Sequence, residues 1–210
     1  MKKIMMIAVV LMSVATVSYS QTNADKLLKD ISARIKSYSS MSVDFKFTMV
    51  NTEADINESS TGSITLKGNK FKMRTNEFGM TVWNDGKSQW SMIDGSGEVN
   101  LENASDVEGG ISPSKIFNIQ EEGMKSTLLS ETASMAVVKL TPTINGGEVK
   151  SVELTVDKSK KSLETATIFG NDGGKYIIEI SNLKTNMNTP DSEFVFNESA
   201  NSDVSIIDLR

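Results

Sequence analysis

The sequence predicts a mainly β fold with short helices (α+β), built on a single antiparallel sheet that curls into a barrel or part of one. Residues 62–101 carry the clearest signal, because apolar and polar residues alternate there between glycine-containing turns. Alternation with a period of two places the apolar side chains of a strand on one face of the sheet. Similar segments continue to residue 183, and about eleven strands are enough to curl one sheet upon itself.

Short turns join the strands within residues 62–101. The Asp-Gly pair at residues 85–86 tolerates the positive φ angles that tight hairpins require. The expected apolar face of this sheet carries Ile64, Leu66, Phe71, Met73, Val82, Trp90 and Met92. What covers that face decides its role, because a packed second layer gives a core, whereas a loose lid leaves a pocket for an apolar ligand.

Residues 1–20 have the features of a cleaved signal peptide. Lys2 and Lys3 precede an apolar stretch at residues 4–17, and Ser18 and Ser20 are the small residues that a signal peptidase reads. A membrane-spanning helix is the alternative, but the stretch is shorter than the roughly 20 apolar residues that cross a bilayer. We expect cleavage after Ser20, so that residues 21–210 form one exported domain.

The composition excludes several kinds of site. The chain has no cysteine and no histidine, which removes disulfides, a lipid anchor on cysteine, thiol catalysis and the commonest general base and metal ligand. Removing Lys2 and Lys3 with the signal peptide leaves 20 basic and 27 acidic residues, a formal charge of −7. An acidic chain without a basic stripe is a poor partner for nucleic acid or for anionic lipid surfaces.

Catalysis without histidine or cysteine would need carboxylates or a Ser-Lys pair. Asp85, Asp94 and Glu98 are the candidates for a hydrolytic pair. Turns and solvated strand positions explain these residues better than chemistry does. We therefore expect no enzyme activity, no cofactor and no metal site.

An amphipathic helix of about four turns is expected at the start of the exported domain. Asn23 or Asp25 can cap it, and Leu28, Ile31 and Ile35 recur with helical spacing along one face. This helix is either packed permanently on the core or forms a lid over a cavity. Periodicity does not separate the two interpretations.

The strand that follows has a bulky apolar face. Phe45 and Phe47 alternate with polar residues within residues 43–49. Residues 51–61 are polar and are predicted to form an exposed connection into the central strands.

A second, shorter helix is expected beyond the central strands. The Ser-Pro pair at residues 112–113 is typical of a helix start, and Ile116 and Phe117 follow it, so this helix is a second lid candidate. Strands then resume, with a short apolar segment in the tail. They are expected at residues 127–130, 136–141, 149–157, 163–169 and 176–183.

Several short strings occur in a characteristic order along the exported domain. They are Gly-x-Ile-x-Leu-Lys at residues 62–67, Asn-Asp-Gly-Lys-x-x-Trp at 84–90, Ser-Pro at 112–113, Phe-Val-Phe at 194–196 and Val-Ser-Ile-Ile-Asp at 204–208. With the leading helix and the phenylalanine-rich strand, this order resembles the LolA family of periplasmic lipoprotein carriers. The resemblance implies a half-open barrel with a helical lid, enclosing an apolar cavity for the acyl chains of lipoproteins.

The resemblance also implies partners and a place of action. An inner-membrane lipoprotein-release transporter would be the donor, an outer-membrane component the acceptor, and the periplasm the location of a monomer. The expected lipid-binding residues are Leu28, Ile31, Ile35, Phe45, Phe47, Ile64, Leu66, Phe71, Met73, Val82, Trp90, Met92, Ile116 and Phe117. The alternative is a lipid-binding sensor or a structural module on the same fold.

The chain departs from the family pattern at the lid. Gly68-Asn69 stand where the carriers have an Arg-Pro pair, whose arginine holds the lid through hydrogen bonds, and Asn197-Glu198 replace a Pro-Pro pair. Either apolar contacts of the helices close the cavity here, or a neighbouring base substitutes for the arginine. The candidate bases are Lys67, Lys70 and Arg74. We expect apolar closure, because alternation places the two lysines on the polar face.

Overall fold

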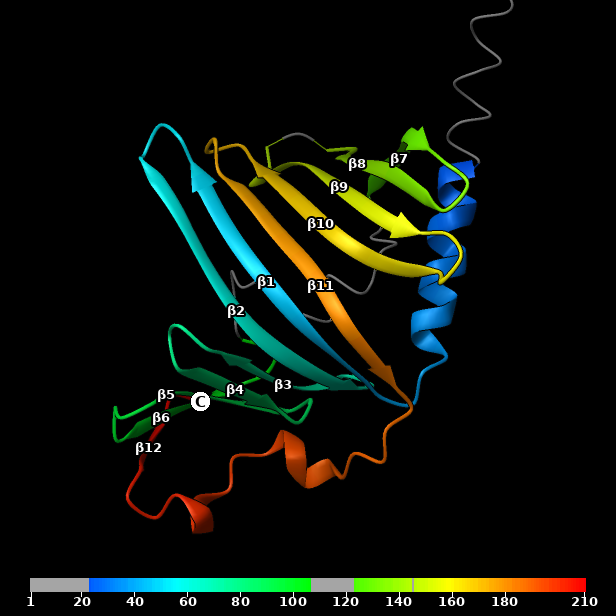
Figure 1. Cartoon of the computed structure of the whole chain (residues 1–210). Helices are drawn as coiled ribbons and strands as arrows, with labels where there is room; N and C mark the ends of the chain where they lie inside the picture. The colour runs from blue at the N-terminus through cyan, green and yellow to red at the C-terminus, as the bar shows by residue number, and fades with distance from the viewer. Residues whose placement is uncertain (1–22, 107–122, 145) are drawn as a thin grey trace, which may run out of the picture.

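The computed structural model describes residues 23–106, 123–144 and 146–210. Its twelve strands form one sheet in the order β12-β6-β5-β4-β3-β2-β1-β11-β10-β9-β8-β7. Neighbouring strands are antiparallel except for β12, which runs parallel to β6. The sheet is curved and open, with β7 and β12 as its two edges (Figure 1).

The elements are mostly the expected strands, with longer bounds. They are β1 (Met41–Asn51), β2 (Ile56–Lys67), β3 (Lys70–Thr75), β4 (Met80–Asn84), β5 (Ser88–Ile93), β6 (Glu98–Asn103), β7 (Met124–Glu131), β8 (Met135–Pro142), β9 (Val149–Asp157), β10 (Ser162–Gly170), β11 (Lys175–Thr185) and β12 (Ser205–Asp208). The N-terminal helix spans residues 23–36. Two 3-10 turns, η1 (Asp191–Phe194) and η2 (Glu198–Ala200), lie in the C-terminal segment. No helix among the described residues is long and apolar enough to cross a membrane.

Strand β2 belongs to both halves of the sheet. It pairs with β1 along almost its whole length, but only Gly62–Lys67 pair with β3. In Figure 1 the shorter strands β3 to β6 lie across the lower end of the long strands. The bend gives the sheet a concave inner face, which carries Ile64 and Leu66, and an outer face.

Two local predictions are wrong. Residues 51–61 do not form one exposed connection, because β2 begins at Ile56 and its first half pairs with β1; polar residues suit a strand whose end is solvated on both faces. Asn23 and Asp25 both lie within the N-terminal helix, so neither is its cap. Asp25 instead accepts a hydrogen bond from the Ser126 hydroxyl and joins the helix to β7.

A glycine permits a close approach near the bend. Gly62 pairs directly with Phe45, and a β-carbon at this position would lie 2.6 Å from Phe45 Cζ. A side chain there would also clash with the Arg74 backbone carbonyl. The absence of a side chain therefore lets the Phe45 ring lie across β2.

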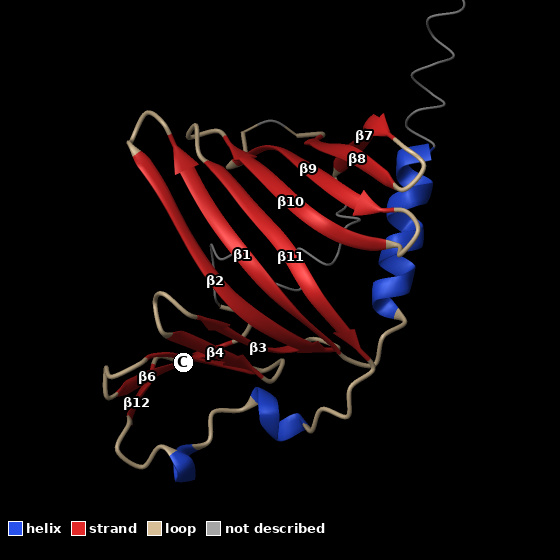
Figure 2. Ribbon diagram, in the orientation of Figure 1, coloured by secondary structure: helices blue, strands red, loops and turns tan. Residues whose placement is uncertain are grey.

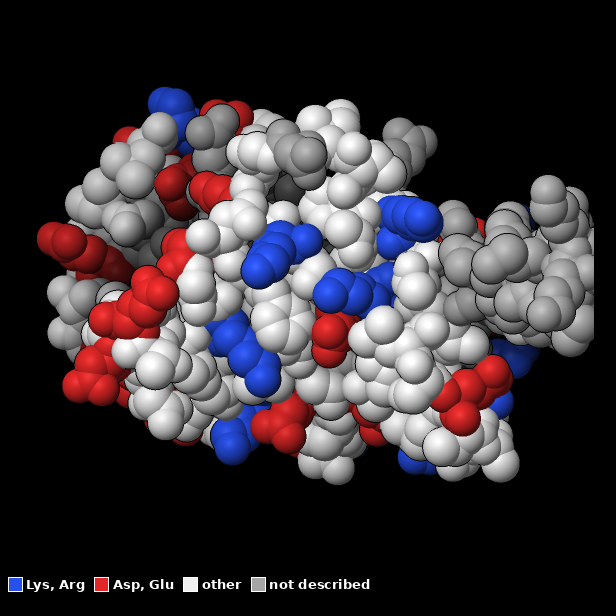
Figure 3. Space-filling model, turned by 90° about the horizontal axis from the view of Figure 1, so that it is seen from above, with Lys and Arg blue, Asp and Glu red and all other residues white. Residues whose placement is uncertain are grey.

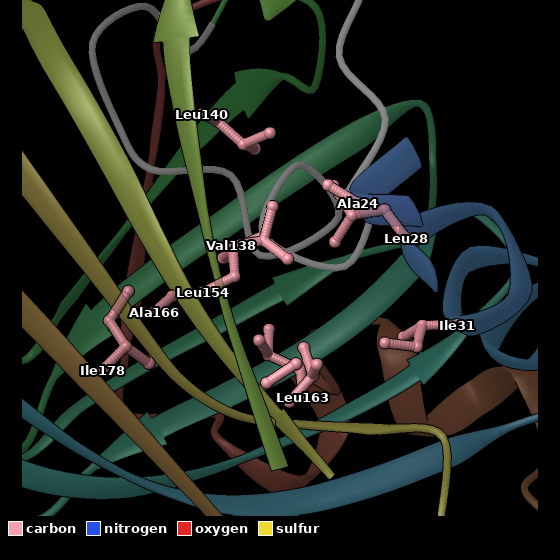
Figure 4. Packing of buried hydrophobic residues seen from close by; sticks show 11 residues of the cluster. Ala24, Leu28, Ile31, Val138, Leu140, Leu154, Leu163, Ala166 and Ile178 are labelled. Atoms are coloured by element: carbon pink, nitrogen blue, oxygen red, sulfur yellow. The ribbon is translucent and has the colours of Figure 1, made fainter. Parts of the chain in front are cut away.

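The inner face is covered by two apolar clusters. In the helix cluster, the N-terminal helix packs on β8 to β11 through Ala24, Leu28 and Ile31, all at most 2 % exposed (Figures 2 and 4). The bend cluster lies where β1 and β2 meet the shorter strands β3 and β4. Its buried members are Met41, Val43, Ile64, Leu66, Phe71 and Val82. Around Leu28 and Ile31 the helix is thus a packed element of the core.

Candidate functional site

Half-buried residues form a seam between the two clusters. Ile35, Phe45 and Ile180 each pack against both clusters, and no fully buried residue among those described belongs to both. Their partial exposure means that the inner face is least completely filled along this line. Ile35, Phe45 and Ile180 therefore mark the boundary between the two clusters on the inner face.

A pocket of about 440 Å³ lies at one end of the seam. Its apolar lining consists of Ile35, Tyr38, Met41, Val43, Leu163, Ile180 and Leu183. It lies where two strands diverge: β10 and β11 pair only between Thr165–Phe169 and Lys175–Glu179, and beyond those pairs both strands line the pocket. The volume is in the range of about 300–1,000 Å³ typical of small-molecule sites.

A second, more polar cavity of about 760 Å³ adjoins the first. Its lining includes Asp44, Lys46 and Ser63, which alternate with inner-face residues along β1 and β2. Both cavities are lined by Glu164, Ile180 and Ser181. The apolar pocket and the more polar cavity therefore both lie where β10 and β11 diverge.

Ten of the predicted lipid-binding residues gather on the inner face. They are Leu28, Ile31, Ile35, Phe45, Phe47, Ile64, Leu66, Phe71, Met73 and Val82. Ile116 and Phe117 lie outside the described residues. Tyr38, Met41, Leu163 and Ile180 line the pocket but were not among the residues predicted for the site. Alternation of apolar residues in residues 163–169 and 176–183 was the signal for the last two, but it does not show that β10 and β11 separate.

The prediction that residues 62–101 share a single apolar face is wrong for Trp90 and Met92. Trp90 pairs with Trp83 and Met92 with Thr81, whereas the inner-face residue Val82 pairs with Ser91. Directly paired residues share a face. Trp90 and Met92 therefore lie on the outer face of the sheet.

The C-terminal segment covers the outer face of the shorter strands. Phe194 is fully buried and Phe196 is 4 % exposed, and the Phe196 ring lies edge-on to Trp83 with centroids 5.4 Å apart. Part of the face predicted to be polar is thus a small apolar core. Because both tryptophans lie on this face, tryptophan fluorescence reports on the C-terminal segment.

The basic residues considered as substitutes for the missing arginine have other partners. Lys67 and Lys70 contact the Asp191 carboxylate at 2.8 and 2.7 Å. Arg74 contacts Asp94 at 2.6 Å and holds the pKa of that carboxyl below its usual range. Within the described part of the chain, none of the three has a hydrogen bond or ion pair to the N-terminal helix.

Asp191 makes attachment of the C-terminal segment dependent on pH. Hydrogen bonds from Lys67 and Lys70 lower the pKa of Asp191 to about 2, so its contribution is complete above the unfolded pKa of about 3.9 and is lost as the pH falls through 2. Asp191→Asn should lower the urea midpoint at pH 6, and the difference from wild type should shrink steadily as the pH falls from about 4 toward 2. A difference that does not change with pH would contradict this account.

Two of the three carboxylates considered for hydrolysis, Asp85 and Asp94, serve local structure. Asp85 Oδ1 accepts hydrogen bonds from the Lys87 and Ser88 backbone amides, both at 2.8 Å, and so closes a turn. Asp94 is the partner of Arg74. The described residues contain no group of three or more acidic side chains placed to hold a metal ion.

Basic and acidic side chains are interspersed over the face in Figure 3, and acidic ones gather at its left end.

Known proteins similar to this chain include solved structures and one family. An uncharacterised conserved protein from Thermus thermophilus superposes with a TM-score of 0.55 at 10 % identity, over 89 % of this chain and 99 % of that one. A LolA superfamily protein from Nitrosomonas europaea gives a TM-score of 0.45 at 14 % identity, over 82 % and 97 %. No curated protein matches the sequence. The family profile described as "Outer membrane lipoprotein carrier protein LolA" matches residues 36–197. Since that match spans more than half of the chain, the protein belongs to the LolA family.

Proposed function

We propose that this protein is a periplasmic carrier that binds the acyl chains of lipoproteins on its inner face and moves them from the inner toward the outer membrane. The observation that carries the proposal is the seam that ends in the apolar pocket. Ile35 and Ile180 take part in both features, so an acyl chain in the pocket would extend between the clusters. Family membership supplies the class of cargo.

A carrier must release what it binds. Burial of a hydrocarbon chain contributes about 0.8 kcal/mol per methylene group, so complete enclosure of an acyl chain would make release slow. A seam of half-buried residues between two independently packed clusters limits the area that a chain buries. We infer that the seam opens to take up an acyl chain and closes after its release.

The test fills the seam and measures binding of an acylated peptide. Ile180→Trp places a larger side chain at the point where the seam meets the pocket. Ile144→Trp is the control, because Ile144 is 80 % exposed and lies outside both clusters. Wild type should bind a tripalmitoylated lipopeptide and not its unacylated form. Calorimetry should show at least about tenfold weaker binding for Ile180→Trp, since overpacking excludes the chain.

Transfer between vesicles separates a carrier from a sensor. Wild type should accelerate movement of the lipopeptide from donor to acceptor vesicles, and Ile180→Trp should not. Binding without transfer would favour the lipid-binding sensor. If a folded Ile180→Trp variant, verified by circular dichroism, binds as tightly as wild type, the seam is not the binding site.

A further inference from the structure

Three basic side chains lie at the mouth of the apolar pocket. Arg34 comes from the end of the N-terminal helix, and Lys160 and Lys161 come from the turn between β9 and β10. Glu164 is the only carboxylate among the described lining residues, and the Ser162 hydroxyl donates a hydrogen bond to it at 2.7 Å. Basic side chains therefore outnumber acidic ones in the lining, although Asp157 and Asp30 pair with two of them and the formal charge of the chain is −5.

Arg34 and Lys161 remain available to a ligand, whereas Lys160 Nζ lies 3.3 Å from an Asp157 carboxylate oxygen. Arg34 Nε donates a hydrogen bond to Tyr38 Oη at 2.8 Å, and no described carboxylate forms an ion pair with Arg34. Lys161 lies 3.5 Å from Asp30, with both side chains about half exposed. Such exposed pairs contribute little, so Lys161 can exchange Asp30 for a ligand anion at small cost.

The backbone at Lys161 supports a role for its side chain. Its φ angle is +52°, in the left-handed region that glycine and asparagine adopt with least strain. A lysine is therefore an unfavourable residue for the turn itself. Strain of this kind is often found at binding sites, where the side chain serves a purpose that the turn does not need.

We propose that this pocket binds the anionic head of a single-chain amphiphile, whose hydrocarbon chain lies on Ile35 and Ile180 and enters the seam. The inference rests on the proposed function, because the seam must accept an acyl chain. Arg34, Lys160 and Lys161 recognise the negative charge, and the apolar lining recognises the chain. A carboxylate and a phosphate ester satisfy the same three cations.

The test compares four palmitoyl amphiphiles by calorimetry below their micelle concentrations. Palmitate and lysophosphatidylglycerol are anionic, whereas lysophosphatidylcholine and monopalmitin carry no net charge. Wild type should bind the anionic pair at least about fivefold more tightly, and salt should weaken that binding by screening. A preference within the anionic pair identifies a carboxylate or a phosphate ester as the natural head.

Charge removal at the mouth should reduce this selectivity. Lys160→Gln/Lys161→Gln should bind the anionic pair with a clearly smaller preference over the neutral pair, because only Arg34 then remains. Lys125→Gln/Lys150→Gln removes two exposed lysines away from the pocket and should remain selective. Lys161→Gly should reduce selectivity without lowering the thermal midpoint, because glycine fits the left-handed backbone.

The outcomes separate the inference from the proposed function. Equal binding of all four compounds by wild type would overturn the anionic site and leave acyl carriage intact. Loss of selectivity in the Lys125/Lys150 control would show a general charge effect and would also overturn the site. Failure of wild type to bind any palmitoyl compound or the lipopeptide would refute the proposed function.

Discussion

Phe194→Ala should lower the free energy of unfolding by about 3–5 kcal/mol, the usual range for a fully buried phenylalanine. Phe194 is 0 % exposed and lies in η1, which contacts β3 and β4. Its removal leaves a cavity between the C-terminal segment and the sheet. Urea denaturation followed by circular dichroism and tryptophan fluorescence provides the measurement.

The neighbouring Val195 offers a matched control. Its side chain is 37 % exposed, so Val195→Ala should change stability by no more than about 0.5 kcal/mol. The two probes should show coincident transitions if the C-terminal segment unfolds with the sheet. A fluorescence transition at lower urea than the circular dichroism transition would show that the segment detaches on its own, contrary to this prediction.

Ile31→Ala should lower the free energy of unfolding by about 2–5 kcal/mol. Ile31 is 0 % exposed and belongs to the buried helix cluster, so the cavity opens in a close-packed region. Ile35→Ala, one turn later in the half-buried seam, should cost clearly less stability. It should weaken lipopeptide binding more than its effect on stability explains, because Ile35 also lines the pocket.

This pair of variants distinguishes a packed helix from a lid. A lid that opens as a whole would make few contacts essential to folding, so Ile31→Ala would then be mild in the ligand-free protein. A loss below about 1 kcal/mol for Ile31→Ala, measured by urea denaturation without ligand, would favour the lid. The large loss that we expect restricts opening to the seam beyond Ile31.

The architecture follows largely from local sequence patterns. Strand patterns located β1 to β11 except for the first half of β2, and helical spacing located the N-terminal helix with Leu28 and Ile31 on its buried face. The tail strand β12 was seen only as a short apolar segment, because four residues carry too little periodicity. The absence of cysteine and histidine removed whole classes of chemistry on composition alone.

The faces of the shorter strands depend on register. Alternation divides each strand into two faces, but the number of residues in a hairpin turn decides which face of the next strand continues it. Here Asn84 pairs with Gln89, which places Trp90 beside Trp83 on the outer face. A turn one residue longer or shorter would have moved Trp90 to the inner face.

By itself the sequence determined the strands, the helix and the apolar character of the inner face, because these depend on neighbours along the chain. Only the tertiary structure decided where Phe194 packs, which face carries Trp90, and where β10 and β11 separate to form the pocket beside Ile180. Each of these depends on pairing between residues far apart in sequence and on the curvature of the whole sheet. Local periodicity carries no information about long-range pairing or about the curvature of the sheet.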